Sequence, residues 1–193
     1  MKYVMSLLLS ASVLFGFGEC DKCAKVPMNV PVDFSKKGTV YESDFQAPWN
    51  IWGSLVQFNL MVGFNVSSSS LLSEQEKKID NYIWNGHPEN ITPYFKVKIT
   101  LTPIGWASED VTVILNSAEW RNRKEKHYVT GQKIEEIVLV PLYGGEKGHA
   151  KTIMIADLQR LRNYHVRVES LEDVELPKGV SSKFVINRFS TKH

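Results

Sequence analysis

Two cysteines, Cys20 and Cys23, are the most reactive side chains of this 193-residue chain, and they are its only cysteines. A Cys-x-x-Cys motif can lower the pKa of a thiol for redox chemistry, but such motifs normally begin a helix in a βαβ unit, which this sequence does not predict. In an oxidising compartment the pair could instead form a local disulfide across a very short loop. A lipid anchor on Cys20 is a third alternative, from which Glu19 departs because small residues usually precede a lipidated cysteine.

Other motifs do not predict catalysis. The glycine-rich segment 144–152 lacks the contiguous Gly-Lys-Ser/Thr of a phosphate-binding loop, because two residues separate Gly148 from Lys151. The five histidines show no metal-ligand spacing. His165 and Glu169, for example, would lie about 13 Å apart along a strand. We therefore expect no catalytic residue, no metal site and no cofactor, and we expect that the protein is not an enzyme.

Two tryptophans are the first candidate binding residues. Trp49 and Trp52 follow Pro48 and precede Gly53, which predicts a loop or a strand edge. Tryptophan is favoured at the energetic centres of protein interfaces, and its ring can also stack on a sugar. In the alternative interpretation, one or both rings fill an end of the fold and are structural.

A basic run with flanking aromatic residues is the second candidate surface. Its cations are Arg121, Arg123, Lys124 and Lys126. The run could contact an acidic protein, an acidic glycan or an anionic lipid. The alternative is a solvated loop between two strands.

Residues 1–18 predict where the protein works. Lys2 is followed by an apolar run, and Gly16 and Gly18 supply the small residues of a cleavage site before Glu19, which is the pattern of a secretory signal peptide. The run is too short to span a bilayer comfortably, and later segments do not reach the length of a membrane helix. We expect an exported protein, periplasmic or extracellular, with no transmembrane span in its mature form.

The charge balance argues against nucleic-acid binding. The chain has 23 basic and 21 acidic side chains, for a net charge of +2. A general nucleic-acid binder would need a strong basic excess. Aromatic residues make up 11% of the chain, which supports an ordered core.

Alternating apolar and polar residues predict a mainly β fold. Phe95 and Val97 alternate with Lys96 and Lys98, which is typical of an antiparallel strand with one buried face. Strand patterns occur in segments 39–46, 55–64, 95–102, 111–115, 134–142, 152–156, 164–169 and 184–189. Turn-rich breaks separate these segments. We therefore predict an Ig-like antiparallel β-sandwich of seven to eight strands.

One α-helix, at about 73–85, is predicted to interrupt the strands. Ser73 and Glu76 are spaced as a capping box. An apolar stripe follows at Ile79, Tyr82 and Ile83. Gly86 and a nearby proline end the pattern. We expect this helix to cover an open end of the sandwich.

Tyr164 begins a predicted strand after a crossing loop, which suggests the tyrosine corner of Ig-like sandwiches. The alternative is a tyrosine that only packs in the core. Val166 stands where a true immunoglobulin domain has a cysteine. In the preceding strand, Ile153 and Ile155 are expected to face inward.

Three parts of the chain carry a resemblance: residues 30–40, the strand 56–64, and the closing residues 164–171 with 175–176 and 184–186. They look like a family of bacterial exported β-sandwich proteins of unassigned function, periplasmic or lipid-anchored. The matching residues serve packing and turns, so the resemblance implies a fold and a location but no functional residue. We divide the chain into a signal peptide (1–18), a tether (19–31), one β-sandwich domain (32–189) and a tail (190–193).

These observations predict an exported, non-enzymatic binding protein of the bacterial cell envelope that acts through protein–protein interaction, for example as an inhibitor or an immunity-type protein. The alternative is a carbohydrate- or lipid-binding module accessory to an envelope enzyme. A hydrolase with a spatially assembled site is a third class, and it would need a cleft of titratable groups with perturbed pKa values.

Overall fold

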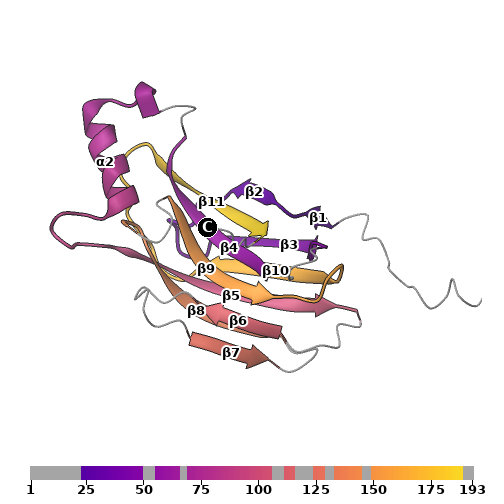
Figure 1. The fold of residues 1–193 in the computed structure, drawn as a ribbon. Coiled ribbons are helices and arrows are strands. Elements are labelled where there is room, and N and C mark those ends of the chain that lie inside the picture. Colours follow the sequence, from indigo (N-terminus) through magenta and orange to yellow (C-terminus); the bar gives the residue numbers. More distant parts are fainter. Residues whose placement is uncertain are drawn as a thin grey trace, which may run out of the picture.

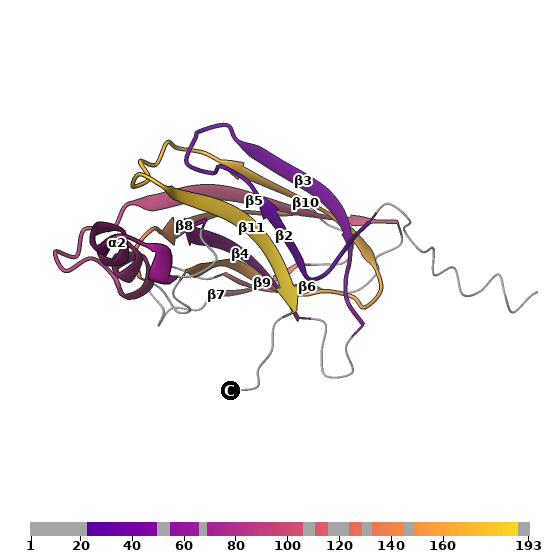
Figure 2. The same ribbon diagram turned by 90° about the horizontal axis from the view of Figure 1, so that it is seen from above.

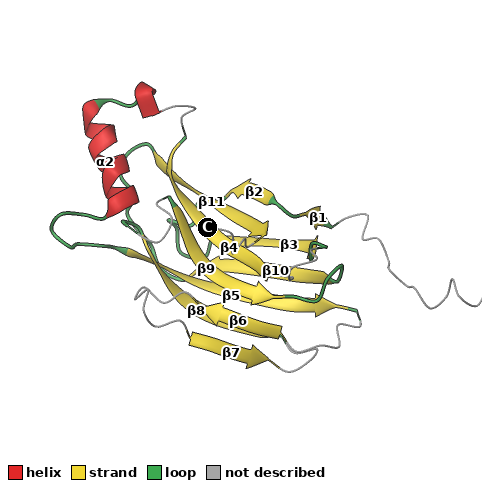
Figure 3. Cartoon of the chain, viewed as in Figure 1, coloured by secondary structure: helices red, strands yellow, loops and turns green. Residues whose placement is uncertain are grey.

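The computed structural model describes residues 23–49, 55–65, 69–105, 111–115, 124–128, 133–144 and 149–188, with the backbone alone for 111–115 and 124–128. In this part of the chain, two β-sheets stack as a β-sandwich with one α-helix, as predicted (Figures 1 and 3). The predicted signal peptide lies outside the described residues.

Five strands form the first sheet, in the order β1-β3-β10-β5-β8, and six form the second, in the order β2-β11-β4-β9-β6-β7. The strands are β1 Ala24–Lys25, β2 Met28–Pro31, β3 Val40–Gln46, β4 Leu55–Phe64, β5 Tyr94–Ile104, β6 Val111–Leu115, β7 Lys124–Tyr128, β8 Ile134–Pro141, β9 Ala150–Asp157, β10 Asn163–Ser170 and β11 Val180–Arg188. The eight predicted strands are all present. Three further strands, β1, β2 and β7, exceed the predicted number.

The alternation that predicted the strands also places the core between the two sheets. In β5, the side chains of Phe95, Val97, Ile99 and Leu101 are buried. β10 pairs with β5 so that Val166 lies opposite Leu101 and Val168 lies opposite Ile99. These residues belong to one buried cluster that also includes side chains of the second sheet and of the helix.

Strand β9 departs from simple alternation. Its register with β4 shifts after Phe58, which pairs with Met154. Ile153 and Met154 are consecutive, yet both are fully buried in the core. Ile155 is buried as well, although it pairs with Gln57 and is not part of that cluster. The physical reason for the consecutive buried residues is a β-bulge, in which one extra residue offsets the alternation.

The segment predicted as an N-terminal tether adds a short strand to each sheet. Ala24 and Lys25 pair in parallel with Phe45 and Gln46 of β3. β2 pairs with β11 in the second sheet. Prolines in this segment favour extended backbone, which suits a linker and the edge of a sheet equally, so the sequence could not distinguish the two.

The helix α2 (Glu74–Asn85) follows a short 3-10 helix, η1 (Ser69–Leu71), and lies at one end of the sandwich (Figures 1 and 2). The predicted capping box is present: the Ser73 hydroxyl accepts from the Glu76 amide at 3.4 Å, and the Glu76 carboxylate accepts from the Ser73 amide at 2.7 Å. Ile83 is buried in the core. The helix ends at Gly86, whose φ of 105° is favourable for glycine.

Replacing Ser73 with alanine should lower the free energy of unfolding by about 1 kcal/mol, because the first turn loses its N-cap acceptor. Urea unfolding of Ser73→Ala and of Ser73→Thr measures this effect. The threonine variant keeps a hydroxyl and should lose less stability than the alanine variant. Equal losses in the two variants would contradict a capping role.

Candidate functional site

Trp49 is a predicted binding residue whose position the structure describes. It follows β3 and exposes 59% of its surface, so its ring does not fill the interior of the sandwich. The guanidinium carbon of Arg160 lies 5.9 Å from the centre of the Trp49 ring, within the range of a cation–π interaction. Trp52 lies outside the described residues.

Three chain segments meet at the end of the first sheet that precedes Trp49: strand β1, the end of β3 and the connection between β9 and β10. Gln46, the last residue of β3, pairs with Lys25 on one side and with Asn163 on the other. This end of β3 is opposite the end that α2 covers (Figures 1 and 2). We call the group the Trp49 platform, which consists of Lys25, Trp49, Arg160 and Arg162.

Hydrogen bonds join the two loops of the platform. The Ala47 amide donates to the Arg162 carbonyl at 2.8 Å, and the Leu161 amide donates to the Ala47 carbonyl at 3.1 Å. The Gln46 side-chain amide donates to the Leu161 carbonyl at 3.3 Å. Leu161 has a φ of 56°, which is uncommon for a residue other than glycine and sets the tight path of this loop. These bonds tie Gln46 and Ala47, which precede Trp49, to Leu161 and Arg162, which follow Arg160.

Tyr164 supports the same loop from inside the sandwich. Its ring is buried and stacks on Phe45 with centroids 5.9 Å apart. Its hydroxyl accepts a hydrogen bond from the Gln159 amide at 3.0 Å. This bond from the ring to backbone a few residues upstream is the arrangement of a tyrosine corner, as the sequence suggested.

Replacing Tyr164 with phenylalanine should lower the free energy of unfolding by about 1 kcal/mol, because the Gln159 amide loses its acceptor. Hydrogen exchange should become faster at residues 159–162 than in β5. Amide exchange followed by NMR measures both regions in one experiment. Unchanged exchange in this loop would mean that the hydroxyl does not hold it.

The platform is positively charged. In the part of the chain that the structure describes, Lys25, Arg160 and Arg162 form no ion pair. Nearby on the first sheet, Asp44 and His165 face each other, with the Asp44 carboxylate 2.7 Å from His165 Nδ1. That carboxylate is therefore engaged with a residue outside the platform.

The predicted basic run is only partly described. Arg121 and Arg123 lie outside the described residues. Lys124 and Lys126 lie in β7, which pairs with β6. The interpretation of this run as a loop therefore does not hold for 124–128. Main-chain pairing with β6 makes this part an outer strand of the second sheet.

Cys23 is disulfide-bonded and directly precedes β1. Cys20, the other cysteine of the sequence, lies outside the described residues. An oxidised cysteine is the state that an exported protein can maintain. Cys23 is therefore adjacent in sequence to β1, the strand that contains Lys25 of the platform.

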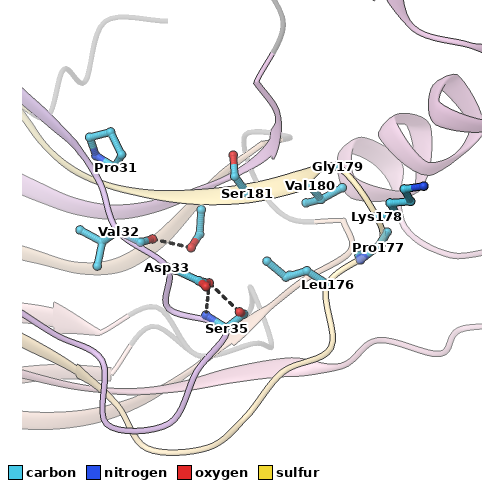
Figure 4. Close-up of a pocket in the computed structure, with 11 residues that line it drawn as sticks. Pro31, Val32, Asp33, Ser35, Leu176, Pro177, Lys178, Gly179, Val180 and Ser181 are labelled. Atoms are coloured by element: carbon cyan, nitrogen blue, oxygen red, sulfur yellow. Dashed lines mark hydrogen bonds between the residues drawn. The ribbon is translucent and has the colours of Figure 1, made fainter.

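A groove of about 540 Å³ lies between the segment after β2 and residues 176–182 (Figure 4). The Asp33 carboxylate accepts from the amide and the hydroxyl of Ser35, at 3.1 and 2.5 Å. The Ser182 hydroxyl donates to the Val32 carbonyl at 2.6 Å. These polar groups hold the walls of the groove together, and its lining residues include no aromatic ring of the kind that ligand pockets favour.

Lys151 is a buried cation that the sequence analysis missed. Its side chain is 2% exposed, and its ammonium donates to the carbonyl of Ile83, at 2.6 Å, and to the carbonyl of Gly144. Burial lowers the pKa of Lys151 to about 8. The carbonyl of Ile83 belongs to the last turn of α2, where carbonyls lack helical partners and attract a cation. Lys151 therefore fastens α2 to the second sheet.

An ionisable pair, His149 and Asp80, involves a residue two positions before this buried lysine. His149 Nε2 is 3.1 Å from the Asp80 carboxylate, without the geometry of a hydrogen bond, and the His149 ring contacts Trp84 edge-on at 5.4 Å. His149 is partly buried and joins the start of β9 to α2.

Strand β8, at the edge of the first sheet, exposes two apolar side chains. Ile137 is 58% exposed and Leu139 is 49% exposed. Glu135 on the same strand is bound by Lys133 at 2.8 Å and by Lys98 at 2.9 Å, and these hydrogen bonds lower its pKa to about 2. Charged groups of this kind discourage edge-to-edge pairing of exposed strands.

Within the described ranges, no group of three histidine, cysteine, aspartate or glutamate side chains is placed to hold a metal ion. None of the helices that the structure describes has the length and apolar character needed to cross a bilayer.

Comparisons with known proteins agree with this fold. The crystal structure of a protein from Sulfurospirillum deleyianum matches 86% of this chain and 99% of its own, with 14% sequence identity and a TM-score of 0.53, which supports a shared fold. The decameric BFDV capsid protein matches 82% of this chain and 98% of its own at 11% identity, with a TM-score of 0.28 that carries no argument. No curated protein matches the chain. Residues 29–188 match the family described as "Domain of unknown function (DUF5625)", and the chain therefore belongs to this family.

Proposed function

We propose that the protein is exported to the bacterial cell envelope and acts there, without catalysis, by binding another protein. The leader-like residues 1–18 support export. The disulfide at Cys23 is compatible with an oxidising compartment. An inhibitor or an immunity-type protein is a concrete form of this function.

One observation carries the binding part of the proposal: Trp49 is exposed, and hydrogen bonds tie the residues before it to the connection between β9 and β10. Tryptophan and arginine are the residues most enriched at the energetic centres of protein interfaces. Here Arg160 lies over the Trp49 ring, and backbone hydrogen bonds join Ala47 to Leu161 and Arg162. A surface that is already ordered loses little conformational entropy when a partner binds, so more of the contact energy appears as affinity.

The carbohydrate- or lipid-binding alternative has weaker support. A sugar site would be expected to combine polar groups with an aromatic platform in one pocket. The groove beside Asp33 has the polar groups but not the ring. Trp49 has the ring, but Arg160 lies over it.

Replacing Trp49 with alanine should weaken partner binding by about 30-fold or more, which corresponds to about 2 kcal/mol for an interface hot spot. The purified protein is immobilised, and captured envelope proteins are quantified by mass spectrometry. Trp84→Ala is the matched control, because Trp84 is also exposed but lies on α2 at the opposite end. Both variants should keep nearly the wild-type melting temperature.

Two results would contradict the proposal. In the first, Trp49→Ala captures the same proteins as the wild type. In the second, Trp49→Ala unfolds, which would make this tryptophan structural.

A further inference from the structure

The chemistry of the partner follows from the charges of the Trp49 platform, and this step rests on the proposed function. Most cations on the outer face of the first sheet are already neutralised. Arg167 pairs with Glu42 at 3.2 Å and with Glu169 at 3.1 Å, and Lys96 pairs with Glu172 at 2.6 Å. That face therefore presents little net charge to a partner.

The platform differs from this face. Lys25, Arg160 and Arg162 have no ionic partner among the described residues. Lys25 and Arg160 are exposed, and Arg162 is half-buried. Three cations thus lie in the segments at the end of β3 that precedes Trp49: Arg160 is over the ring, Lys25 pairs with Gln46, and the Arg162 carbonyl accepts from the Ala47 amide.

The geometry of arginine indicates which anion would bind. Its planar guanidinium presents a rigid fork of donors that matches a carboxylate with two parallel hydrogen bonds. Arg160 and Arg162 are separated by Leu161, whose positive φ turns the backbone between them. We propose that the Trp49 platform receives an acidic segment of a partner protein, whose aspartate or glutamate carboxylates contact Lys25, Arg160 and Arg162.

An anionic membrane is a different occupant, and the observations favour it less. Recognition of anionic lipid surfaces typically uses clusters of about four to eight lysines or arginines, more than the three cations of the platform. Arg160 also lies over the Trp49 ring, which limits insertion of that ring among lipid headgroups. The compact, ordered arrangement suits a protein surface better.

The test is an NMR titration of the isotope-labelled protein with three probes. The first is a twelve-residue peptide of alternating glutamate and serine, the second is the same peptide with glutamine for glutamate, and the third is vesicles of phosphatidylglycerol. The glutamate peptide should shift the Trp49 indole signal and the amides of residues 160–162. It should bind at least about tenfold more tightly than the glutamine peptide, because carboxylates supply the attraction.

Charge reversal gives the quantitative control. The triple variant Lys25→Glu, Arg160→Glu, Arg162→Glu should bind the glutamate peptide at least about tenfold more weakly, because like charges repel. Lys78→Glu, on the exposed face of α2, should change binding less than about twofold, since a charge more than one Debye length away is screened. Salt should weaken the wild-type interaction.

Three outcomes would overturn the proposal: equal affinity for the two peptides, shifts at sites away from the platform, or binding to the vesicles alone. Failure of this inference can be told apart from failure of the proposed function. If Trp49→Ala reduces capture of envelope proteins but the triple variant does not, the binding function stands and the acidic partner is rejected. If neither variant changes capture, both are rejected.

Discussion

Replacing Phe184 with alanine should lower the free energy of unfolding by about 3–5 kcal/mol, the range for a large aromatic side chain removed from a packed core. Phe184 is fully buried in β11. Its ring centroid lies 5.3 Å from that of Tyr41, 6.4 Å from that of Phe34 and 6.5 Å from that of Phe58, so it joins aromatic residues of both sheets. Guanidinium unfolding at neutral pH measures the loss.

The control for this variant is Phe184→Leu, which removes less volume and should lose clearly less stability than the alanine variant. Substitutions of exposed residues usually change the free energy of unfolding by less than about 1 kcal/mol. If both variants lose less than this, the Phe184 ring is not packed in the core. Such a result would contradict the sandwich described here more directly than any surface substitution could.

The stability of the protein should rise with pH between about 8 and 10.5 through Lys151. Burial lowers the pKa of this lysine from 10.5 to about 8, so in this pH range the unfolded chain binds more protons than the folded chain. Stability increases with pH wherever the unfolded state binds more protons. At about 1.4 kcal/mol for each pH unit between the two pKa values, the gain is at most about 3–4 kcal/mol.

The measurement compares the wild type with Lys151→Met from pH 7.5 to pH 10.5, because other titrating groups contribute equally to both proteins. The free energy of unfolding of the wild type, relative to that of the variant, should rise across this range. A difference that stays flat or falls would show that the buried lysine does not titrate as described. If Lys151→Met does not fold, direct NMR titration of the Lys151 side chain in the wild type replaces the comparison, and a pKa near 10.5 contradicts the prediction.

The strands were predictable because a period of two in the sequence directly reflects a sheet with one buried face. In β5 and β10, alternation alone identified the buried residues. In β9 the bulge opposite Phe58 broke the alternation, so the sequence did not predict that the consecutive residues Ile153 and Met154 are both buried in the core. Lys151 was not predicted to be buried, because its partners are backbone carbonyls of Ile83 and Gly144. Contacts with a backbone carbonyl do not depend on the type of the partner residue, so the sequence does not indicate them.

The candidate site was only partly predictable. Trp49 was identified because it lies between Pro48 and Gly53, in a segment predicted to be a loop or a strand edge. Its exposure is known from the structure. The cations around it could not be found in the same way, because Lys25 and Arg160 are far apart in the sequence. They come to the same end of the first sheet only because β1 and β10 flank the same strand, β3. Sequence charge analysis instead favoured the run at 121–126, where the cations are contiguous.

Photo-crosslinking beside the platform tests the proposed function most directly. Ile104 is exposed at the end of β5 and pairs with Asn163 of β10, next to the platform, so a benzophenone side chain there leaves Trp49 intact. Leu71, exposed near α2 at the other end, is the control position. In cells that produce the protein, we expect irradiation to link a discrete protein to position 104 and not to position 71. Equal labelling at the two positions, or labelling at position 71 alone, would contradict a partner-binding surface around Trp49.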